Sequence, residues 1–482
     1  MKSFHSSLIF FLLFWRQITA HTTKNIINDD SSHLYNSSVT GLLKLLEMEQ
    51  NFIETMKAYT NKMAEKVKNL QAFIDSTDYR VKESLEDREK YVANPLNAFS
   101  LMRRTHQDLP KWHNYSQQYV GMEELYALEE ILAKAPDEKD MEYFLREMHR
   151  LEKIYDLEAT DLARGRLQNK QYDIKLTLRD CVVLGEHKLQ EGDYKRASMW
   201  FRMAIKHEPE ENAEIVNNIL GDPRDRLNKQ YAGSMIIYGI IKSNPSLTFQ
   251  EAKEISHEAL NTSSLEDMKY LINELLNQTD NEIIREMNVN RTAPTDYELG
   301  CRDRYSKRSN LVCSYNFNQT EFLRIAPLKQ EVINVDPHIK IYHKVLSDDE
   351  IAKLKQDSEI NPIKKSILQR VTDMTGNMFP LTDDLKVSDH VPSSYDKPLH
   401  KFVEANQTGT LIFFLDNVEQ GGATVFPKLK VSIFPQKGSC LFWYSESPDP
   451  RIEALECPVL QGNKWVITKQ MHTKIKDFGL KQ

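Results

Sequence analysis

The pattern of apolar and polar residues is most regular between residues 40 and 75. Apolar side chains recur there at alternating steps of three and four residues, broken only at Glu49, and no Pro or Gly falls between Leu42 and Ile74. This spacing puts the apolar residues on one face of an α-helix and is typical of a coiled-coil seam. It predicts one long amphipathic helix, either in the core of a helical bundle or at a dimer interface. The stripe contains Leu42, Leu45, Phe52, Met56, Tyr59, Met63, Val67, Leu70 and Ile74.

Residues 178 to 209 show a second helical pattern, which fits one tetratricopeptide repeat. Small side chains at Gly185 and Ala197 allow two helices to approach, Phe201 fills the space between them, and Pro209 ends the second helix. A weaker second copy is indicated by Leu220-Gly221 and Pro245, which have the same mutual spacing as in the first copy. One such unit cannot bury both of its faces, so we expect neighbouring helices to cover it. The matching positions are Leu184, Gly185, Gly192, Tyr194, Ala197, Phe201, Ala204 and Pro209.

The C-terminal part of the chain changes to strand-like patterns. Residues 261 to 320 are polar and predict a linker or surface loops, whereas Ile339 to Tyr342 alternates like a β-strand. Ser347 is a predicted helix cap, because the acidic residues after it suit the first turn of a helix. We therefore predict an α+β protein, with helices in its N-terminal half and a sheet in its C-terminal part.

Composition restricts the class of protein. The formal net charge is −7 and no basic arm or patch stands out, which excludes broad nucleic-acid binding. Lys2, the apolar run from Leu8 to Trp15, and Ala20 predict a secretory signal peptide over residues 1–20. Its apolar run is too short to cross a bilayer, and we expect no membrane span later in the chain. Sequons suited to a lumenal chain begin at Asn36, Asn114, Asn261, Asn277, Asn290, Asn318 and Asn406.

The five cysteines predict a limited disulfide framework. An odd number leaves at least one thiol unpaired within the chain. Cys301 and Cys313 form the predicted bridge, because they close a short polar loop. The chain has no C-x-x-C motif, which argues against an intrinsic thiol oxidoreductase.

Two segments near the C-terminus are GGATVFPKLKVSIFPQKGSCLFWY, residues 421–444, and CPVLQGNKWVITKQMH, residues 457–472. Both segments resemble the alpha subunits of prolyl 4-hydroxylases. Near the N-terminus the matching segment is NPLNAFSLMRRTHQDLPKW, residues 94–112, which in that family lies in a region that dimerises. The resemblance therefore favours the dimer interface as the role of the long predicted helix.

The resemblance implies three domains after the signal peptide. They are an N-terminal helical dimerisation region over residues 25–155, a tetratricopeptide-like peptide-binding domain over residues 165–285, and an oxygenase domain over residues 295–482. The last is expected to be a double-stranded β-helix, or jelly-roll, of the Fe(II)/2-oxoglutarate oxygenase type, shortened relative to the family. Cys457 matches a family cysteine whose usual partner lies further toward the C-terminus; here Cys440 could replace that partner, or both thiols could be free.

The resemblance also implies a reaction and partners. The family hydroxylates peptidyl proline at the 4-position in procollagen-like chains, with Fe(II), 2-oxoglutarate, O2 and ascorbate. It assembles as a homo- or heterodimer of alpha-type subunits, with protein disulfide isomerase as the beta subunit in the lumen of the endoplasmic reticulum. The C-terminal GLKQ is not a KDEL-type signal, so we expect that partner to retain the chain. Proline-rich, collagen-like peptides bind aromatic side chains, and the implied contacts are Tyr194, Tyr231 and Tyr238.

The positions at which the family binds iron are substituted in this chain. Non-haem Fe(II) oxygenases hold the metal with two histidines and one carboxylate. The resemblance places these ligands at Leu399, Lys401 and Ala454, where neither apolar side chain has a donor atom and the ammonium group repels a cation. Lys464 matches the family lysine that pairs with the distal carboxylate of 2-oxoglutarate. The substitutions predict a catalytically impaired subunit that acts in peptide binding or assembly.

Two other hypotheses stay open from the sequence. The chain could be an active procollagen-proline 4-dioxygenase whose iron site is rearranged onto His390, Asp396, His400 or His472. Alternatively, it could be a structural secreted glycoprotein, with no affinity for peptides and no isomerase partner.

Overall fold

The computed structural model describes residues 39–86, 88–208, 213–243, 293–306, 312–356, 363–376, 385–390, 407–444 and 449–472, together with residues 254, 256, 270 and 277. The predicted signal peptide lies outside these ranges. The chain divides into two compact units, a helical unit up to Asp140 and a larger unit from Met141 onward. Among the described residues, none of the helices combines the length and the apolar character that crossing a membrane requires.

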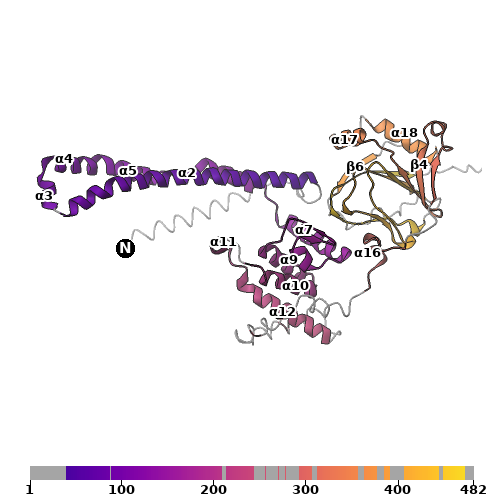
Figure 1. The fold of residues 1–482 in the computed structure, drawn as a ribbon, viewed down its shortest axis with the longest axis horizontal. Coiled ribbons are helices and arrows are strands. Elements are labelled where there is room, and N and C mark those ends of the chain that lie inside the picture. The colour runs from indigo at the N-terminus through magenta and orange to yellow at the C-terminus, as the bar shows by residue number, and fades with distance from the viewer. Residues whose placement is uncertain are drawn as a thin grey trace, which may run out of the picture. The chain divides into compact units, whose positions relative to one another are not determined.

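The helical unit is built on one long helix, which confirms the prediction from the apolar stripe. Helix α2 runs from Val39 to Glu86 and is the long indigo helix of Figure 1. Shorter helices return along it: Trp112 stacks on Phe73 with ring centroids 4.5 Å apart, and Lys62 Nζ lies 2.5 Å from Glu124 Oε1. These shorter elements are α3 (Arg88–Ala93), α4 (Pro95–Arg103), η1 (Arg104–Asp108), α5 (Leu109–Gln117) and α6 (Met122–Leu132).

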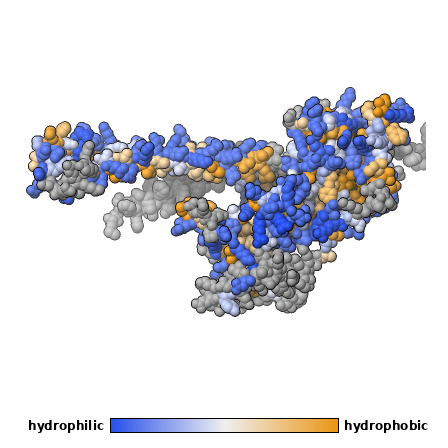
Figure 2. All heavy atoms as spheres, in the orientation of Figure 1, coloured by the Kyte–Doolittle hydropathy of each residue, from blue (hydrophilic) through white to orange (hydrophobic). Residues whose placement is uncertain are grey.

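A second apolar face of α2 stays exposed within this unit. Leu46, Ile53, Val67 and Ile74 are spaced at multiples of seven residues, and their exposed fractions range from 46% to 61%. Figure 2 shows apolar atoms, in orange, among the blue atoms of this unit. The predicted stripe is therefore divided between two faces of α2: its members Met56, Met63, Val67 and Ile74 are exposed, whereas the others are partly buried. Leu46 and Ile53, which the stripe did not include, add to the exposed face. We call Leu46, Ile53, Met56, Met63, Val67 and Ile74 the exposed seam.

The larger unit begins with a helical part in which the predicted repeat is present. Helix α9 starts at a capping box formed by Thr177 and Asp180 and packs antiparallel against α10. A Cβ atom added at Gly185 would lie only 2.6 Å from the Phe201 ring, so the glycine permits the close approach of the two helices. The elements are α7 (Glu138–Tyr155), α8 (Ala159–Ala163), β1 (Arg166–Leu167), β2 (Lys170–Gln171), α9 (Leu178–Gln190), α10 (Tyr194–Ile205), α11 (Ala213–Leu220) and α12 (Arg224–Ser243).

The second copy of the repeat differs from the prediction. Leu220 is the last residue of α11, and Gly221 follows it with a φ of +80°. A Cβ atom added at Gly221 would meet nothing within 4 Å, so this glycine ends a helix and does not serve a close helix contact. Helix α12 instead packs along α10.

Residues 261 to 320 are not simply the predicted linker. The described part of this stretch forms helix α16 (Asp296–Cys301) and strand β3 (Val312–Asn316), and β3 belongs to a large sheet.

This sheet has seven antiparallel strands in the order β3-β4-β5-β11-β7-β14-β6. The strands other than β3 are β4 (Leu328–Asn334), β5 (His338–His343), β11 (Cys440–Tyr444), β7 (Gln407–Phe414), β14 (Lys464–His472) and β6 (Leu385–His390). Two short sheets accompany it, ordered β10-β9-β12 and β13-β8. Their strands are β8 (Gln420–Gly421), β9 (Thr424–Phe426), β10 (Val431–Ile433), β12 (Leu455–Glu456) and β13 (Val459–Gln461).

The large sheet has a different core on each face. On β7, Leu411 and Phe413 pack with helices α17 (Asp348–Gln356) and α18 (Lys364–Thr375), whereas Ile412 and Phe414 pack toward the short β10-β9-β12 sheet. This alternation follows from the two-residue period of a strand. Helix α17 begins at the predicted Ser347 cap, with the Ser347 hydroxyl 2.9 Å from a Glu350 carboxylate oxygen. We call the core between the large sheet and the β10-β9-β12 sheet the inner core.

The disulfide prediction was wrong. Cys301 is bonded to Cys457, with Cα atoms 5.5 Å apart, while Cys313 is an exposed free cysteine. The physical reason is that Cys313 lies on β3 and pairs across the sheet with Glu331, whereas Cys301 ends α16, which packs against β9 and the neighbouring β12. Cys440, the alternative partner weighed for Cys457, is buried and free.

Candidate functional site

The inner core contains one of the positions where the resemblance places an iron ligand. Ala454 is 1% exposed and belongs to an apolar cluster that includes Phe426 and Trp443. The ring centroids of these two aromatic residues are 5.4 Å apart, in an edge-to-face arrangement. Leu399 and Lys401 lie outside the described residues. Around Ala454, the inner core is therefore lined chiefly by apolar and aromatic side chains.

A buried ion pair lies in the same interior. Lys464 begins β14 and shares a strand face with Val466, a member of the inner core. Its Nζ atom lies 3.2 Å from Glu456 Oε2, and both residues are 2% exposed. The contact is close enough for an ion pair but lacks the alignment of a hydrogen bond. Because a buried charge is costly unless it is paired, each of these side chains depends on the other.

An aromatic ring adds to this environment. Lys464 Nζ lies 6.0 Å from the centroid of the Phe414 ring, which faces the inner core from β7. That separation is at the outer limit of a cation–π contact. The ammonium group is therefore held between one carboxylate and one aromatic face.

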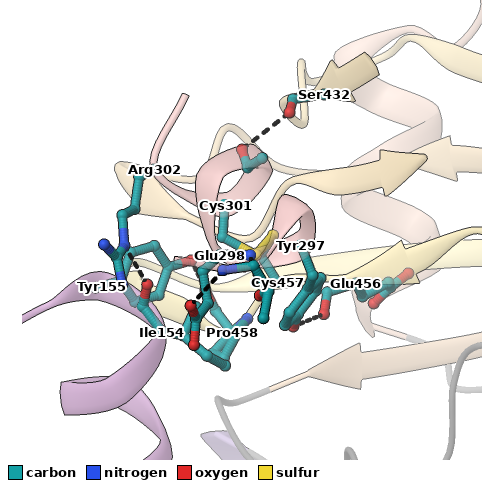
Figure 3. Close-up of a disulfide and its surroundings, with 12 residues drawn as sticks. Ile154, Tyr155, Tyr297, Glu298, Cys301, Arg302, Ser432, Glu456, Cys457 and Pro458 are labelled. Atoms are coloured by element: carbon teal, nitrogen blue, oxygen red, sulfur yellow. Dashed lines mark hydrogen bonds between the residues drawn. A yellow bond between two sulfur atoms is a disulfide. The ribbon is translucent and has the colours of Figure 1, made fainter. Parts of the chain in front are cut away.

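The backbone around Glu456 is fixed at several points, shown in Figure 3. The Tyr297 hydroxyl donates to the Glu456 carbonyl oxygen at 2.7 Å. The next residue, Cys457, carries the disulfide to α16, and its N–H donates to the Ala423 carbonyl oxygen at 2.7 Å. Glu456 also pairs across β12 and β9 with Thr424. The carboxylate of Glu456 thus projects from a backbone with little freedom.

The same segment joins the sheet to the helical part of the larger unit. The Tyr155 hydroxyl, at the end of α7, donates to the Pro458 carbonyl oxygen. Arg302 Nε donates to the Ile154 carbonyl oxygen at 2.6 Å. Burial raises the pKa of the Tyr155 hydroxyl, which favours the protonated form that donates this hydrogen bond. One hydrophobic cluster runs through the whole junction and contains Tyr155, Trp200, Cys301, Val425 and Cys457.

The residues that the structure describes do not fit an iron centre. Within the part of the chain that the structure describes, no group of three His, Cys, Asp or Glu side chains could hold a metal ion. His390 pairs in register with Lys464 at the start of β14, whereas His472 is at the other end of that strand. At about 3.3 Å per residue the two histidines are separated by about 26 Å along the strand, too far to bind one ion. Asp396 and His400, the other alternative ligands, lie outside the described residues.

The three predicted peptide-binding tyrosines differ in exposure. Tyr231 is 1% exposed and its hydroxyl accepts a hydrogen bond from Arg202 at 3.2 Å. Tyr238 is 8% exposed, and its ring centroid lies 6.1 Å from that of Tyr194. Tyr194 is partly exposed. Two of the three tyrosines are therefore packed into the helical core, and Tyr194 has the most surface available to a peptide.

A second buried ion pair lies in the helical part of this unit. Glu152 Oε1 and Lys188 Nζ are 3.0 Å apart, and both side chains are fully buried. Burial lowers the pKa of Lys188 and raises the pKa of Glu152. The opposite charge of each partner counteracts the effect of burial on the other. The neighbouring His149 has a pKa lowered to about 4, chiefly by burial and then by the charge of Lys188. These groups support packing of α7 on α9.

Sequence reasoning missed Glu456. The available signal was a single carboxylate in the apolar run ALECPVL, residues 454–460, directly before the strand that carries Lys464. A lone acidic residue in such a run indicates a buried pair, because an unpaired buried carboxylate is costly. No comparable signal marks Tyr155, whose partner is a backbone oxygen far along the chain.

Comparison with known proteins agrees with the resemblance. The model of the prolyl 4-hydroxylase alpha-subunit N-terminal region matches residues 38–169. The chain is 26% identical to prolyl 4-hydroxylase subunit alpha-2 of Gallus gallus over 511 residues, covering 92% of this chain and 94% of that protein. It is 26% identical to human prolyl 4-hydroxylase subunit alpha-3 over 529 residues, covering 92% of each chain.

Among solved structures, a viral collagen prolyl hydroxylase from Paramecium Bursaria Chlorella virus-1, in complex with 2OG, matches 28% of this chain and 96% of its own. The sequence identity is 19% and the TM-score is 0.23, which is too low to identify a shared fold. The sequence comparisons cover nearly the whole chain and agree with one another. Residues 38–169 therefore match the N-terminal region of prolyl 4-hydroxylase alpha subunits, and the similarity to these subunits extends over 92% of the chain.

Proposed function

We propose that this chain is an alpha-type subunit of the endoplasmic reticulum whose oxygenase domain is catalytically impaired, and that it acts as a peptide-binding or assembly subunit. The family reaction is the 4-hydroxylation of peptidyl proline in procollagen-like chains. The observation that carries the proposal is the burial of Ala454 among apolar side chains, at a position where the family places an iron ligand.

The separation of the alternative histidines supports the same proposal. An active enzyme with a rearranged iron site needs donors that converge on one point. His390 and His472 lie at opposite ends of β14 and do not converge. The remaining carboxylate of the inner core, Glu456, is engaged with Lys464. An active procollagen-proline 4-dioxygenase remains the alternative that the experiment must exclude.

A role in assembly is supported by the exposed seam of α2. Its heptad spacing is that of a coiled coil, and a second alpha-type subunit, of the same or another kind, is the proposed occupant. Protein disulfide isomerase is the proposed beta subunit, which would keep the chain in the endoplasmic reticulum. Proline-rich peptides are the proposed ligands of the helical part, with Tyr194 as the accessible aromatic contact.

Metal analysis tests the proposal directly. The full chain is co-expressed with protein disulfide isomerase, loaded with Fe(II) in the presence of 2-oxoglutarate, and measured for bound iron and for succinate released with a proline-rich peptide. The chicken alpha-2 subunit, prepared in the same way, is the positive control. We expect no bound iron and no succinate above background from this chain. Near-stoichiometric iron, or peptide-dependent succinate, would overturn the proposal and favour the active enzyme.

A further inference from the structure

We infer that Glu456 acts as an internal replacement for a ligand carboxylate, so that Lys464 is already neutralised and the inner core is closed to 2-oxoglutarate and other dicarboxylates. This inference rests on the proposed function, since it takes Lys464 to stand where the family binds the distal carboxylate of 2-oxoglutarate. It goes beyond loss of iron, because a chain without iron could keep an anion site.

The first argument is charge. Lys464 and Glu456 are equally buried, and their ion pair is neutral as a whole. A dicarboxylate entering the inner core would add uncompensated negative charge in a medium of low dielectric constant, which is strongly unfavourable. To bind Lys464 it would have to displace Glu456, which would then be left buried without a partner. The neighbouring Phe414 ring offers no partner to an anion.

The second argument is preorganisation. Glu456 is held by the Tyr297 hydrogen bond, by β-pairing to Thr424 and by the disulfide of the adjacent Cys457. Its carboxylate therefore meets Lys464 without the loss of translational freedom that a free ligand suffers. Even flexible tethering gives effective concentrations of about 1 mM or more, and a fixed strand gives a larger value. A free dicarboxylate at about 1 mM is therefore a weak competitor of the Glu456 carboxylate for Lys464.

The third argument is the neighbouring hydroxyl of Thr424. Thr424 lies opposite Glu456 in the β9–β12 register, so both side chains occupy the same face of the short sheet. Thr424 is 1% exposed, and its hydroxyl has no hydrogen-bond partner among the described residues. A buried hydroxyl and a buried ammonium are both suitable donors for a carboxylate. Removal of the Glu456 side chain would leave Lys464 without its carboxylate partner and Thr424 beside the vacated position.

Equilibrium binding to the unmodified chain is the first test. The full chain, co-expressed with protein disulfide isomerase, is titrated with radiolabelled 2-oxoglutarate, with and without Fe(II). We expect no saturable binding at millimolar concentrations. Saturable binding that Lys464→Met abolishes would overturn the inference, whether or not iron is present. If the chain binds 2-oxoglutarate in this way but binds no iron, this inference fails while the proposed function stands. Failure of the inference and failure of the proposed function are therefore distinguishable.

Chemical rescue is the second test. Glu456→Ala is expected to lower the melting temperature and then to recover it by about 3 °C or more when acetate or 2-oxoglutarate is added, because a bound anion stabilises the folded state. The unmodified chain and the double variant Lys464→Met/Glu456→Ala are the matched controls, and neither is expected to respond. A folded Glu456→Ala variant that no carboxylate stabilises would overturn the inference. If that variant does not fold, the titration of the unmodified chain still decides.

Discussion

Removal of the Cys301–Cys457 disulfide is the sharpest test of the fold. The bridged cysteines are 156 residues apart in sequence, so the bond closes a long loop in the unfolded chain. The chain-entropy relation gives about 5 kcal/mol for a loop of that length, while measured disulfides typically contribute about 2–4 kcal/mol. We expect the variant Cys301→Ala/Cys457→Ala to lose stability in this range. The measurement is the urea concentration at the midpoint of unfolding, in buffer that contains neither a reductant nor an oxidant.

Cys313→Ala is the matched control for that experiment. Cys313 is exposed and free, so its replacement is expected to change stability by less than about 0.5 kcal/mol. Alkylation of the native protein should label Cys313, whereas Cys181 is buried with a pKa raised to about 12 and stays unreactive. If Cys313 is protected from alkylation, and its replacement is as destabilising as that of Cys301, the Cys301–Cys457 pairing is refuted in favour of a Cys301–Cys313 bridge.

Three further predictions concern the helices. Gly185→Ala should destabilise the protein by about 1–3 kcal/mol through overpacking against Phe201. Gly239→Ala in α12 is the control and should not destabilise it, because a Cβ atom there meets open space. Thermal unfolding compares the two variants. The lowered pKa of His149 means that the unfolded chain binds more protons between about pH 6.5 and pH 4, so stability should fall as the pH decreases through this window. A His149→Gln variant that shows the same acid loss in melting temperature would contradict this assignment. Val67→Asp, on the exposed seam, tests the proposed dimer: light scattering should find the variant monomeric, while circular dichroism finds the helical content of the unmodified chain. Light scattering that still detects dimers would exclude the seam as the interface.

Elements with a local signal could be predicted from the sequence. The long helix α2, the Gly185–Phe201 contact, the strand containing Ile339 and the cap at Ser347 all depend on residues within a few positions of one another. Their signals are periodicity, small side chains at helix contacts and capping residues, each of which acts over one or two turns.

Features that depend on distant partners could not be predicted. The partner of Cys301 was missed because the sheet brings Cys457 to α16, and no spacing rule records that approach. The burial of Tyr231 depends on α12 packing against α10, which repeat offsets do not specify. The pairing of Lys464 with Glu456 depends on two strands of different sheets facing one interior. In each case the deciding contact joins elements that are not neighbours in the local pattern.

The shared hydrophobic cluster at the junction makes the sheet region a structural partner of the helices. Val425 and Cys457 of the sheet region complete the same core as Tyr155 and Trp200 of the helices. Deleting the sheet region would therefore uncover this core and leave the apolar face of the helices to water. A mutation that unfolds the sheet region would therefore also destabilise the helices that share its core. The sheet region thus has a structural role that does not depend on any chemistry it supports.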